Sequence, residues 1–177
     1  MDLAARARLC HGAGMAPDVF NSTILAPALT WFAGLVPSVP VEATARVLLL
    51  AIAGQESGWQ DVQQGGGGPG MGPWQFETET CLEILNNAAT KDAALAVCKA
   101  LEVVPSEVGV YRQLLAQPNL ACAFARLDLW ANPRPLPAVG DHHDAWVYYL
   151  ATWRPGRPGP DRWPGNYQAA MTALQLT

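Results

Sequence analysis

The chain has 177 residues, of which 50% are apolar and 15% are charged. This length suits one domain with a substantial core, and the composition is that of a globular protein rather than a disordered one. The net charge is −4 and the pI is about 5.2, so no basic surface for nucleic acid is expected. Residues 1–8 lack the apolar segment of a secretory signal, and the apolar run from Val47 to Ala53 is too short to span a bilayer.

The N-terminal part predicts an arm followed by an irregular helix. Residues 1–15 are expected to form an arm or a short helix that ends at a pair of glycines. Residues 17–34 predict a helix with Pro17 in its first turn, where a missing N–H group costs little. Pro27 falls inside this helix, so we expect a kink or a break there.

The helix expected from Val41 onward carries the first candidate for chemistry. Glu56 lies four residues beyond Ile52, on the apolar stripe of that helix. A carboxyl group held against apolar walls loses hydration, so its pKa rises and it can act as a general acid on a glycosidic oxygen. If Glu56 tilts into water instead, it has no such role. The apolar stripe consists of Val41, Ala45, Leu48, Leu49 and Ile52.

A glycine-rich stretch follows this helix, and regular structure is not expected from Gly65 to Pro73. It lacks the Gly-Lys-Ser/Thr ending of a phosphate loop, so we expect a tight loop or a minimal β-hairpin whose backbone lies close to a ligand. The next residues, Trp74, Gln75 and Phe76, are expected to be extended. Alternation along an extended segment then places the two aromatic residues in the core and Gln75 in the cleft.

The rest of the chain predicts helices joined by short connections, and therefore a mainly α fold. Asp141 is expected to cap a helix that runs to Trp153, after an extended proline-containing connector from Asn132 to Gly140. A loop rich in proline and glycine follows from Arg154 to Pro160. The other helices are predicted at residues 78–88, 91–103, 106–116, 119–130 and 162–176.

Two groups of metal-ligating or nucleophilic residues are better explained by structure than by chemistry. The run from Asp141 to Asp144 contains two histidines, but neighbours at a helix start point about 100° apart and do not all meet one ion. A helix cap with solvated histidines is the better interpretation. The four cysteines, Cys10, Cys81, Cys98 and Cys122, form no Cys-x-x-Cys pair. The last three lie in helical patterns and are expected to be small buried residues. Neither a metal nor a cofactor is expected.

An aromatic run lies on the helix after Asp141. Tyr149 and Trp153 share a helix face, as do Trp146 and Tyr149, and Tyr148 belongs to the same run. Two interpretations stay open, because such residues either pack in a core or form a platform on which sugar rings stack.

Two of these segments together resemble the lysozyme-like superfamily, especially lytic transglycosylases and goose-type lysozymes. Those families carry a Glu-Ser pair at the end of a buried helix and a Gly-x-x-Gln segment after it. Glu56-Ser57 and the segment from Gly72 to Gln75 match this pattern. The resemblance is greatest to small lysozyme-like proteins of bacteriophages, which have Gln-Glu-Ser-Gly followed by a Gly-x-Trp-Gln-Phe-Glu segment. It is strongest from Ile52 to Glu79 and extends more weakly to the C-terminus.

The resemblance implies one mainly α, lysozyme-like domain over residues 1–177 that cleaves the MurNAc-β-1,4-GlcNAc bond of peptidoglycan. It implies that Glu56 is the general acid and then the base, and that Ser57 helps to orient it. Gly72 and Gln75 would belong to the substrate site, where Gln75 binds a sugar amide or hydroxyl group. Lytic transglycosylases also have a late tyrosine, often in Ala-Tyr-Asn-Ala-Gly, that faces the catalytic glutamate. This chain lacks that motif, so the substrate-binding candidates there are Tyr148 and Tyr149.

A second carboxylate would decide the mechanism, because inverting and retaining glycosidases both use a pair. The candidates are Asp61, Glu77 and Glu79. Lytic transglycosylases need no second carboxylate, since the substrate's N-acetyl group assists and the muramyl 6-hydroxyl attacks. A lone Glu56 therefore favours a transglycosylase, with a hydrolytic lysozyme (muramidase) as the near alternative.

The alternative of another class is a structural or adaptor protein of the virion that kept the fold and lost activity. The missing tyrosine motif and the missing export signal motivate it. As an enzyme, the chain would have the glycan strands of peptidoglycan as its partner, with other virion proteins as further partners. Without a signal peptide, we expect synthesis in the host cytoplasm and action at the bacterial cell wall or periplasm. An endolysin released through a holin and a virion component both fit this expectation.

Overall fold

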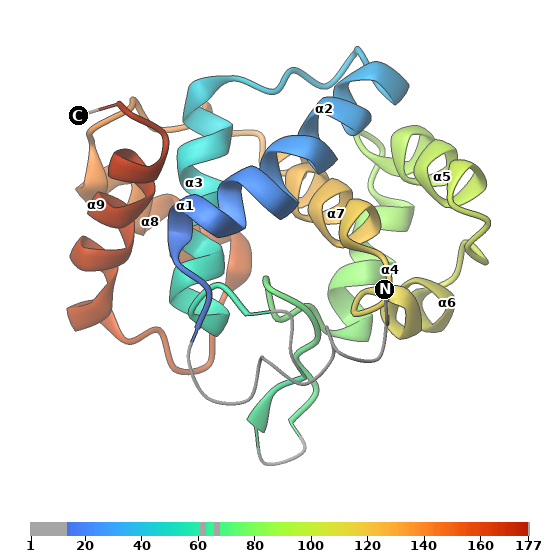
Figure 1. Cartoon of the computed structure of the whole chain (residues 1–177). Helices are drawn as coiled ribbons and strands as arrows, with labels where there is room; N and C mark the ends of the chain where they lie inside the picture. Colours follow the sequence, from blue (N-terminus) through green and yellow to red (C-terminus); the bar gives the residue numbers. More distant parts are fainter. Residues whose placement is uncertain (1–13, 61–62, 66–67, 177) are drawn as a thin grey trace, which may run out of the picture.

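The computed structural model describes residues 14–60, 63–65 and 68–176, and within these the chain is mainly helical, as predicted (Figure 1). Extended pairing in this part of the chain consists of two isolated antiparallel bridges, Gln63 with Met71 and Met71 with Phe76. The helical segments are α1 (Pro17–Phe20), η2 (Asn21–Leu25), α2 (Ala26–Leu35), α3 (Ala43–Ser57), α4 (Thr78–Asn86), α5 (Lys91–Ala100), α6 (Glu107–Gln113), α7 (Pro118–Ala131), α8 (His142–Trp153), η4 (Pro160–Arg162) and α9 (Trp163–Ala173).

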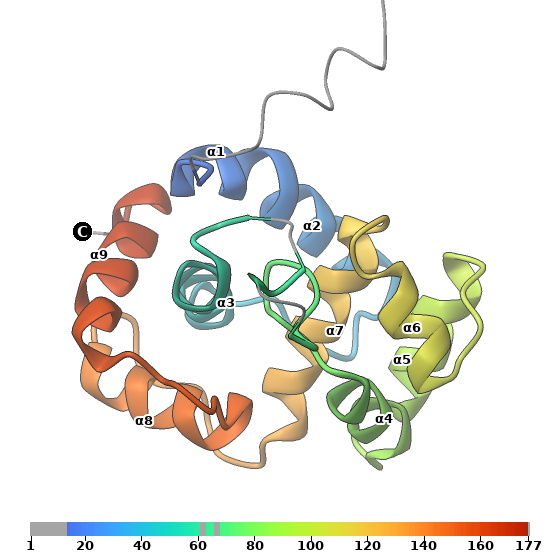
Figure 2. The ribbon, with the colours of Figure 1, turned by 90° about the horizontal axis from the view of Figure 1, so that it is seen from below.

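Helix α3 is the central element of the fold. Figure 2 shows it nearly end-on, with α1, α7, α8 and α9 around it. Every residue from Val47 to Gln55 is buried, so the prediction of a single apolar stripe was too narrow. The helix also begins at Ala43 rather than Val41. A helix that is apolar on all sides belongs inside a domain, where neighbours cover each face.

The predicted break at Pro27 takes the form of a π-helical segment. Between α1 and α2 the chain widens into η2, and the Ala26 amide donates to the Asn21 carbonyl, five residues back. Pro27 has no N–H group and its ring crowds the preceding turn, so the hydrogen-bond pattern shifts just before it. The axis of the helix therefore continues, and Phe20, Leu25 and Phe32 all reach the core.

The end of α3 is set by two glycines with different roles. Gly58 adopts a left-handed conformation with φ of 65° and closes the helix through its bond to the Gly54 carbonyl. Gly54 lies under the indole ring of Trp59, and a Cβ atom there would lie 2.4 Å from that ring. The Trp59 indole also donates to the Leu50 carbonyl at 2.9 Å. The chain therefore folds back over the last turn of α3, directly beside Glu56.

The other predicted helices exist, with ends that differ by a few residues from the expectation. Ser106 caps α6 and Asp141 caps α8, where the Asp141 carboxylate accepts from the Asp144 amide at 3.0 Å, as predicted. Buried side chains from all of the main helices belong to one apolar cluster. Cys81, Cys98 and Cys122 are buried in it, as predicted, and they are free thiols. Cys10 and most of the expected N-terminal arm lie outside the described residues. Within the described part of the chain, none of the helices has the length and apolar character needed to cross a bilayer.

Candidate active site

The segment from Met71 to Phe76 forms a tight turn beside the end of α3. The Met71 and Phe76 amides exchange hydrogen bonds with each other's carbonyls at 3.0 Å. Gln75, inside the turn, has a left-handed backbone with φ of 51°. The prediction that residues 74–76 are extended was therefore wrong. The turn reverses the chain because Gly72, with φ of 74°, permits a conformation that most residues avoid.

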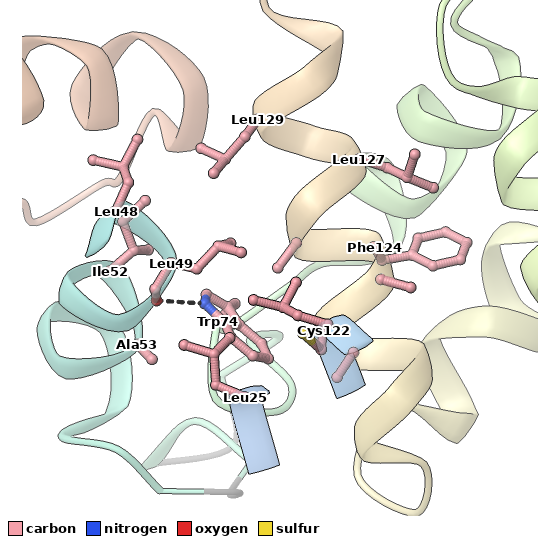
Figure 3. Close-up of a cluster of buried hydrophobic side chains, with 14 of the residues drawn as sticks. Leu25, Leu48, Leu49, Ile52, Ala53, Trp74, Cys122, Phe124, Leu127 and Leu129 are labelled. Atoms are coloured by element: carbon pink, nitrogen blue, oxygen red, sulfur yellow. Dashed lines mark hydrogen bonds between the residues drawn. The ribbon is translucent and has the colours of Figure 1, made fainter. Parts of the chain in front are cut away.

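Trp74 anchors this turn to the centre of the fold. Its side chain is 1% exposed, and its indole N–H donates to the Leu49 carbonyl of α3 at 2.9 Å (Figure 3). The indole of Trp153, from the end of α8, donates in turn to the Trp74 carbonyl at 3.0 Å. Phe76 is also buried and stacks on Trp153. Both aromatic residues lie in the core as predicted, although the turn rather than an extended strand puts them there.

Gln75 lies on the wall of the main cavity, between the two buried aromatic residues. Its side-chain amide donates to the Gly72 carbonyl at 2.7 Å, which holds it against the turn. Gly70 lies directly behind it, and a Cβ atom there would lie 2.8 Å from Gln75 Oε1. Gly72 itself is buried and its carbonyl accepts from Gln75, so the structure gives it a supporting position under the cavity wall rather than on it.

Glu56 occupies the last turn of α3 and lines the same cavity. The hydroxyl of Tyr149, from α8, donates to Glu56 Oε1 at 2.6 Å. Burial, the largest effect, raises the pKa of Glu56, while the Tyr149 hydrogen bond and the positive charge of Arg162 act against it. The pKa of Tyr149 is also raised, by its own burial and by the Glu56 charge, so its hydroxyl stays protonated and remains the donor. Glu56 is thus a half-buried carboxyl group whose pKa lies above its ordinary value.

Two tyrosines were candidates for the position opposite the glutamate, and the structure separates them. Tyr148 is 4% exposed and donates to the Leu129 carbonyl at 2.8 Å, so it packs between α8 and α7. It is a core residue, and the substrate-binding position suggested for it is not supported. The tyrosine that reaches Glu56 is Tyr149.

The ring of Tyr149 is held from behind by aromatic contacts. It stacks on Trp163 at 5.2 Å between ring centroids, with an angle of 12° between the planes, and packs against Trp146 at 5.3 Å. Core packing therefore accounts for most of the aromatic run of α8, and the platform for sugar rings stays a prediction. Trp146 and Tyr148 pack in the interior, while Tyr149 and Trp153 also reach the cavity.

Ser57 and Gln55, the neighbours of Glu56, both bind backbone groups. The Ser57 hydroxyl donates to the Ala53 carbonyl at 3.0 Å and accepts from the Gln60 amide at 3.1 Å. These bonds shape the turn after α3 rather than orient the Glu56 side chain, as had been expected of Ser57. Gln55 is 1% exposed and donates to the carbonyls of Pro158 and Gly159.

The bonds of Gln55 fix the loop between α8 and α9 beside Glu56. Asn166 of α9 completes the network by donating to Gln55 Oε1 at 2.8 Å. This loop brings Arg157 and Arg162 to the cavity, and Arg162 is close enough to lower the pKa of Glu56. Sequence reasoning quoted Gln55 within the motif without a role, and it missed Arg162. The sequence did give a sign of this role for Gln55. It is a polar residue near the end of an apolar helix, and a buried side-chain amide needs hydrogen-bond partners.

The main cavity has a volume of about 1100 Å³ and is lined mostly by polar groups. This exceeds the roughly 300–1,000 Å³ of common small-molecule pockets, so the space suits a large, polar ligand. Its walls come from the end of α3, residues 63–65 and 69–70 of the glycine-rich loop, the turn at residues 75–77, α4, Asp128 of α7, and the segment from Tyr149 to Arg162. The hydroxyl of Tyr111 in α6 donates to the Pro69 carbonyl at 2.7 Å and so supports the glycine-rich loop.

Further carboxyl groups line the side of the cavity formed by α4 and α7. Glu77 and Glu79, two of the three sequence candidates, are among them, while Asp61 lies outside the described residues. Sequence reasoning missed Glu83, which pairs with Arg154, and Asp128, which is 7% exposed on α7. The signal for Asp128 was present, because it is the one acidic residue in the apolar sequence from Pro118 to Ala131.

Comparison of the chain with protein-family models, with curated proteins and with solved structures finds no match. A proposal for the function therefore rests on the cavity itself, which is lined by the hydrogen-bonded pair of Glu56 and Tyr149 and by further carboxyl groups.

Proposed function

We propose that this protein is a lysozyme-like, peptidoglycan-degrading enzyme that cleaves the MurNAc-β-1,4-GlcNAc bond, with Glu56 as its general acid and base. The observation that carries the proposal is the Tyr149–Glu56 hydrogen bond in the wall of a large polar cavity. The sequence resemblance to lytic transglycosylases calls for a tyrosine opposite a glutamate at a helix end. Tyr149 stands in that position although its surrounding sequence differs from the family motif.

The first step is protonation of the leaving group by Glu56. Burial raises the pKa of Glu56, so a larger fraction of this carboxyl group carries a proton when the glycan binds. Tyr149 engages Oε1, which leaves Oε2 to carry that proton toward the glycosidic oxygen. As the proton transfers, the bond from this oxygen to C1 of MurNAc breaks, and the acetamido oxygen of the same MurNAc bonds to C1. Tyr149 and Arg162 then stabilise the Glu56 carboxylate that remains.

The second step uses that carboxylate as a base. It takes the proton of the muramyl 6-hydroxyl, whose oxygen attacks C1 and displaces the acetamido oxygen. The product is a 1,6-anhydromuramyl end, and Glu56 returns to its acid form. A hydroxyl on the same ring can have an effective molarity of about 10⁵ to 10⁸ M when it is well oriented, which is why it outcompetes water. The protein is on this basis a lytic transglycosylase.

A hydrolytic lysozyme is the second candidate, and one observation favours it. Glu77 and Glu79 line the same cavity as Glu56, so a carboxylate is at hand on the wall formed by α4. If one of them activates water, the product carries a reducing muramyl end instead of an anhydro end.

Mass spectrometry of digested peptidoglycan tests the proposal directly. The anhydro product is lighter by one water than the hydrolytic product, so the two outcomes separate cleanly. We expect anhydromuramyl ends from the wild-type protein and no cleavage by Glu56→Gln. Reducing ends alone would contradict the transglycosylase and point to Glu77 or Glu79. No cleavage by folded protein on accessible wall would contradict both enzymes and favour the structural virion protein.

A further inference from the structure

Asp128 is a buried carboxyl group that the mechanism above does not use. It lies on α7 and is more than nine-tenths buried. Its Oδ2 atom is buried and has no hydrogen-bond partner among the described residues. Burial, together with the nearby Glu83 charge, raises the pKa of Asp128 to about 7, and Arg154 opposes this rise. Buried polar atoms normally have partners, so a carboxyl group that lines a cavity and leaves one oxygen unpartnered is a candidate for contact with a bound ligand.

Asp128 lies where two cavities meet. Asp128 lines the main cavity and also a second cavity of about 390 Å³. The two share Glu83, Asp128 and Arg154 in their walls. Arg154, at the end of α8, pairs with Glu83 of α4. Both partners of this ion pair are more than half exposed, so it is a weak surface contact at the junction rather than a fixed wall.

The second cavity is an open, shallow surface with a mixed apolar and polar lining, which suits the C–H faces and hydroxyl groups of a sugar ring. Asn87, Asn132, Arg134 and Thr152 contribute to it. The Asn132 amide donates to the Thr152 hydroxyl at 2.8 Å, which holds both side chains in place before a ligand arrives. The lining is uncharged apart from the junction residues and Arg134, so hydroxyl-bearing groups suit it better than a strongly charged ligand does.

We propose that the two cavities form one groove for a glycan strand, and that Asp128 contacts a sugar residue at their junction, beyond the sugars that flank the cleaved bond. This inference rests on the proposed function and adds a binding site to it. A carboxyl group donates to a sugar hydroxyl when neutral and accepts from it when ionised, so the contact persists in either form. Other titratable groups that face Asp128 are Glu83 and Arg154 at the junction, Cys81 of α4 and Tyr148 of α8.

The test is the dependence of affinity on ligand length, measured by calorimetry with chitin oligosaccharides of two and six sugars. All proteins carry Glu56→Gln, so that the ligands stay intact. In the parent we expect the hexamer to bind more tightly than the dimer. Asp128→Leu removes the hydrogen bond and should weaken hexamer binding about tenfold while leaving dimer binding unchanged. Asp128→Asn keeps a donor and an acceptor at the same place, so it should restore most of the affinity. Asp92→Asn, an acidic position on α5, serves as the matched control.

The outcomes separate this inference from the proposed function. Equal hexamer affinity in the parent and both Asp128 variants would overturn the inference while Glu56-dependent wall cleavage stands. So would equal losses for dimer and hexamer, since they would place Asp128 beside the cleaved bond. A parent that binds the hexamer no better than the dimer would overturn the shared groove. If Asp128→Leu does not fold, Asp128→Ala replaces it, and the comparison with Asp128→Asn decides in the same way. Failure of both binding and wall cleavage would remove the proposed function as well.

Discussion

The hydroxyl of Tyr149 lies 2.6 Å from Glu56 Oε1, although 93 residues separate the two in the sequence. The contact joins the end of the central helix α3 to α8. It acts on the pKa of Glu56, on which the proposed role as a general acid depends. Burial pushes Glu56 toward its neutral form, and Tyr149 limits how far. The predictions below test this balance and the scaffold around it.

Replacing the acid with its neutral isostere should abolish activity without unfolding the protein. Glu56→Gln can still accept from Tyr149 through its side-chain oxygen, so the fold keeps that contact. General acid–base groups contribute about 10² to 10⁴-fold to rate. We expect lysis in a zymogram to disappear while the melting temperature stays the same or rises, because a carboxyl group whose pKa is raised by burial weakens the fold at neutral pH. A folded variant with full activity would refute the assignment.

Tyr149→Phe should shift the pH dependence of the reaction. The lost hydrogen bond stabilised the ionised form of Glu56, so the pKa of Glu56 rises further. The acid form of Glu56 then persists to higher pH, so the alkaline limb of the pH–rate profile moves to higher pH. The maximal rate falls. Tyr148→Phe is the matched control on the neighbouring position. It loses the bond to the Leu129 carbonyl, so it should lower the melting temperature and leave that limb in place. Equal shifts in both variants would contradict the role given to Tyr149.

Trp74 and Gln75 are adjacent in the turn beside Glu56, but their replacement should have different effects on stability and on turnover. Trp74→Ala removes a fully buried indole and its bond to α3, which should cost about 3–5 kcal/mol in the free energy of unfolding. Gln75→Ala removes a group on the cavity wall and one local bond to Gly72, so turnover should fall more than stability does. Thermal melts and wall-cleavage rates of both variants decide the matter. Equal losses of stability would show that Gln75 serves the fold alone.

Two glycines within helices should respond in opposite ways to alanine. Gly54→Ala places a Cβ atom against the ring of Trp59, so we expect a loss of about 1–3 kcal/mol and a disturbed turn beside Glu56. Gly34 of α2 has nothing within 4 Å of the same position. Gly34→Ala should therefore gain about 0.5–1 kcal/mol from reduced backbone entropy in the unfolded chain. Chemical denaturation measures both, and a neutral Gly54→Ala would show that Trp59 moves freely.

The stability of the protein should depend on pH through Asp128. Its pKa is about 7 in the folded state and near 3.8 in an unfolded chain, so unfolding releases a proton between these values. Folding stability contributed by this group therefore falls as the pH rises from near 4 to 7, by about 1.4 kcal/mol per pH unit at most, and then levels off. The side chain of Asp128→Asn does not ionise, so this variant does not lose stability over the same pH range. The difference in melting temperature between variant and wild type should be smallest near pH 4 and largest above pH 7, and a constant difference would contradict the raised pKa.

Local rules were enough to predict several features of this protein. Pro27 interrupts a helix because it has no N–H group to donate, and the chain responds with a π-helical segment. Asp141 caps α8 because a short acidic side chain satisfies a free amide at a helix start. The placement of Glu56 at the end of an apolar helix followed from a spacing of four residues in the sequence.

Other features of the candidate site depend on the tertiary structure and could not be predicted from local sequence. Tyr148 and Tyr149 are adjacent and chemically identical, and only the packing of α8 between α7 and the end of α3 selects Tyr149 for Glu56. Gln75 has a left-handed backbone that its own sequence does not favour, and it is held there by Trp74 on one side and Gly70 on the other. The pKa values of Glu56 and Asp128 depend on burial and on charges from distant segments. Dehydration of a carboxyl group is a property of the assembled cavity, so no stretch of the sequence determines it alone.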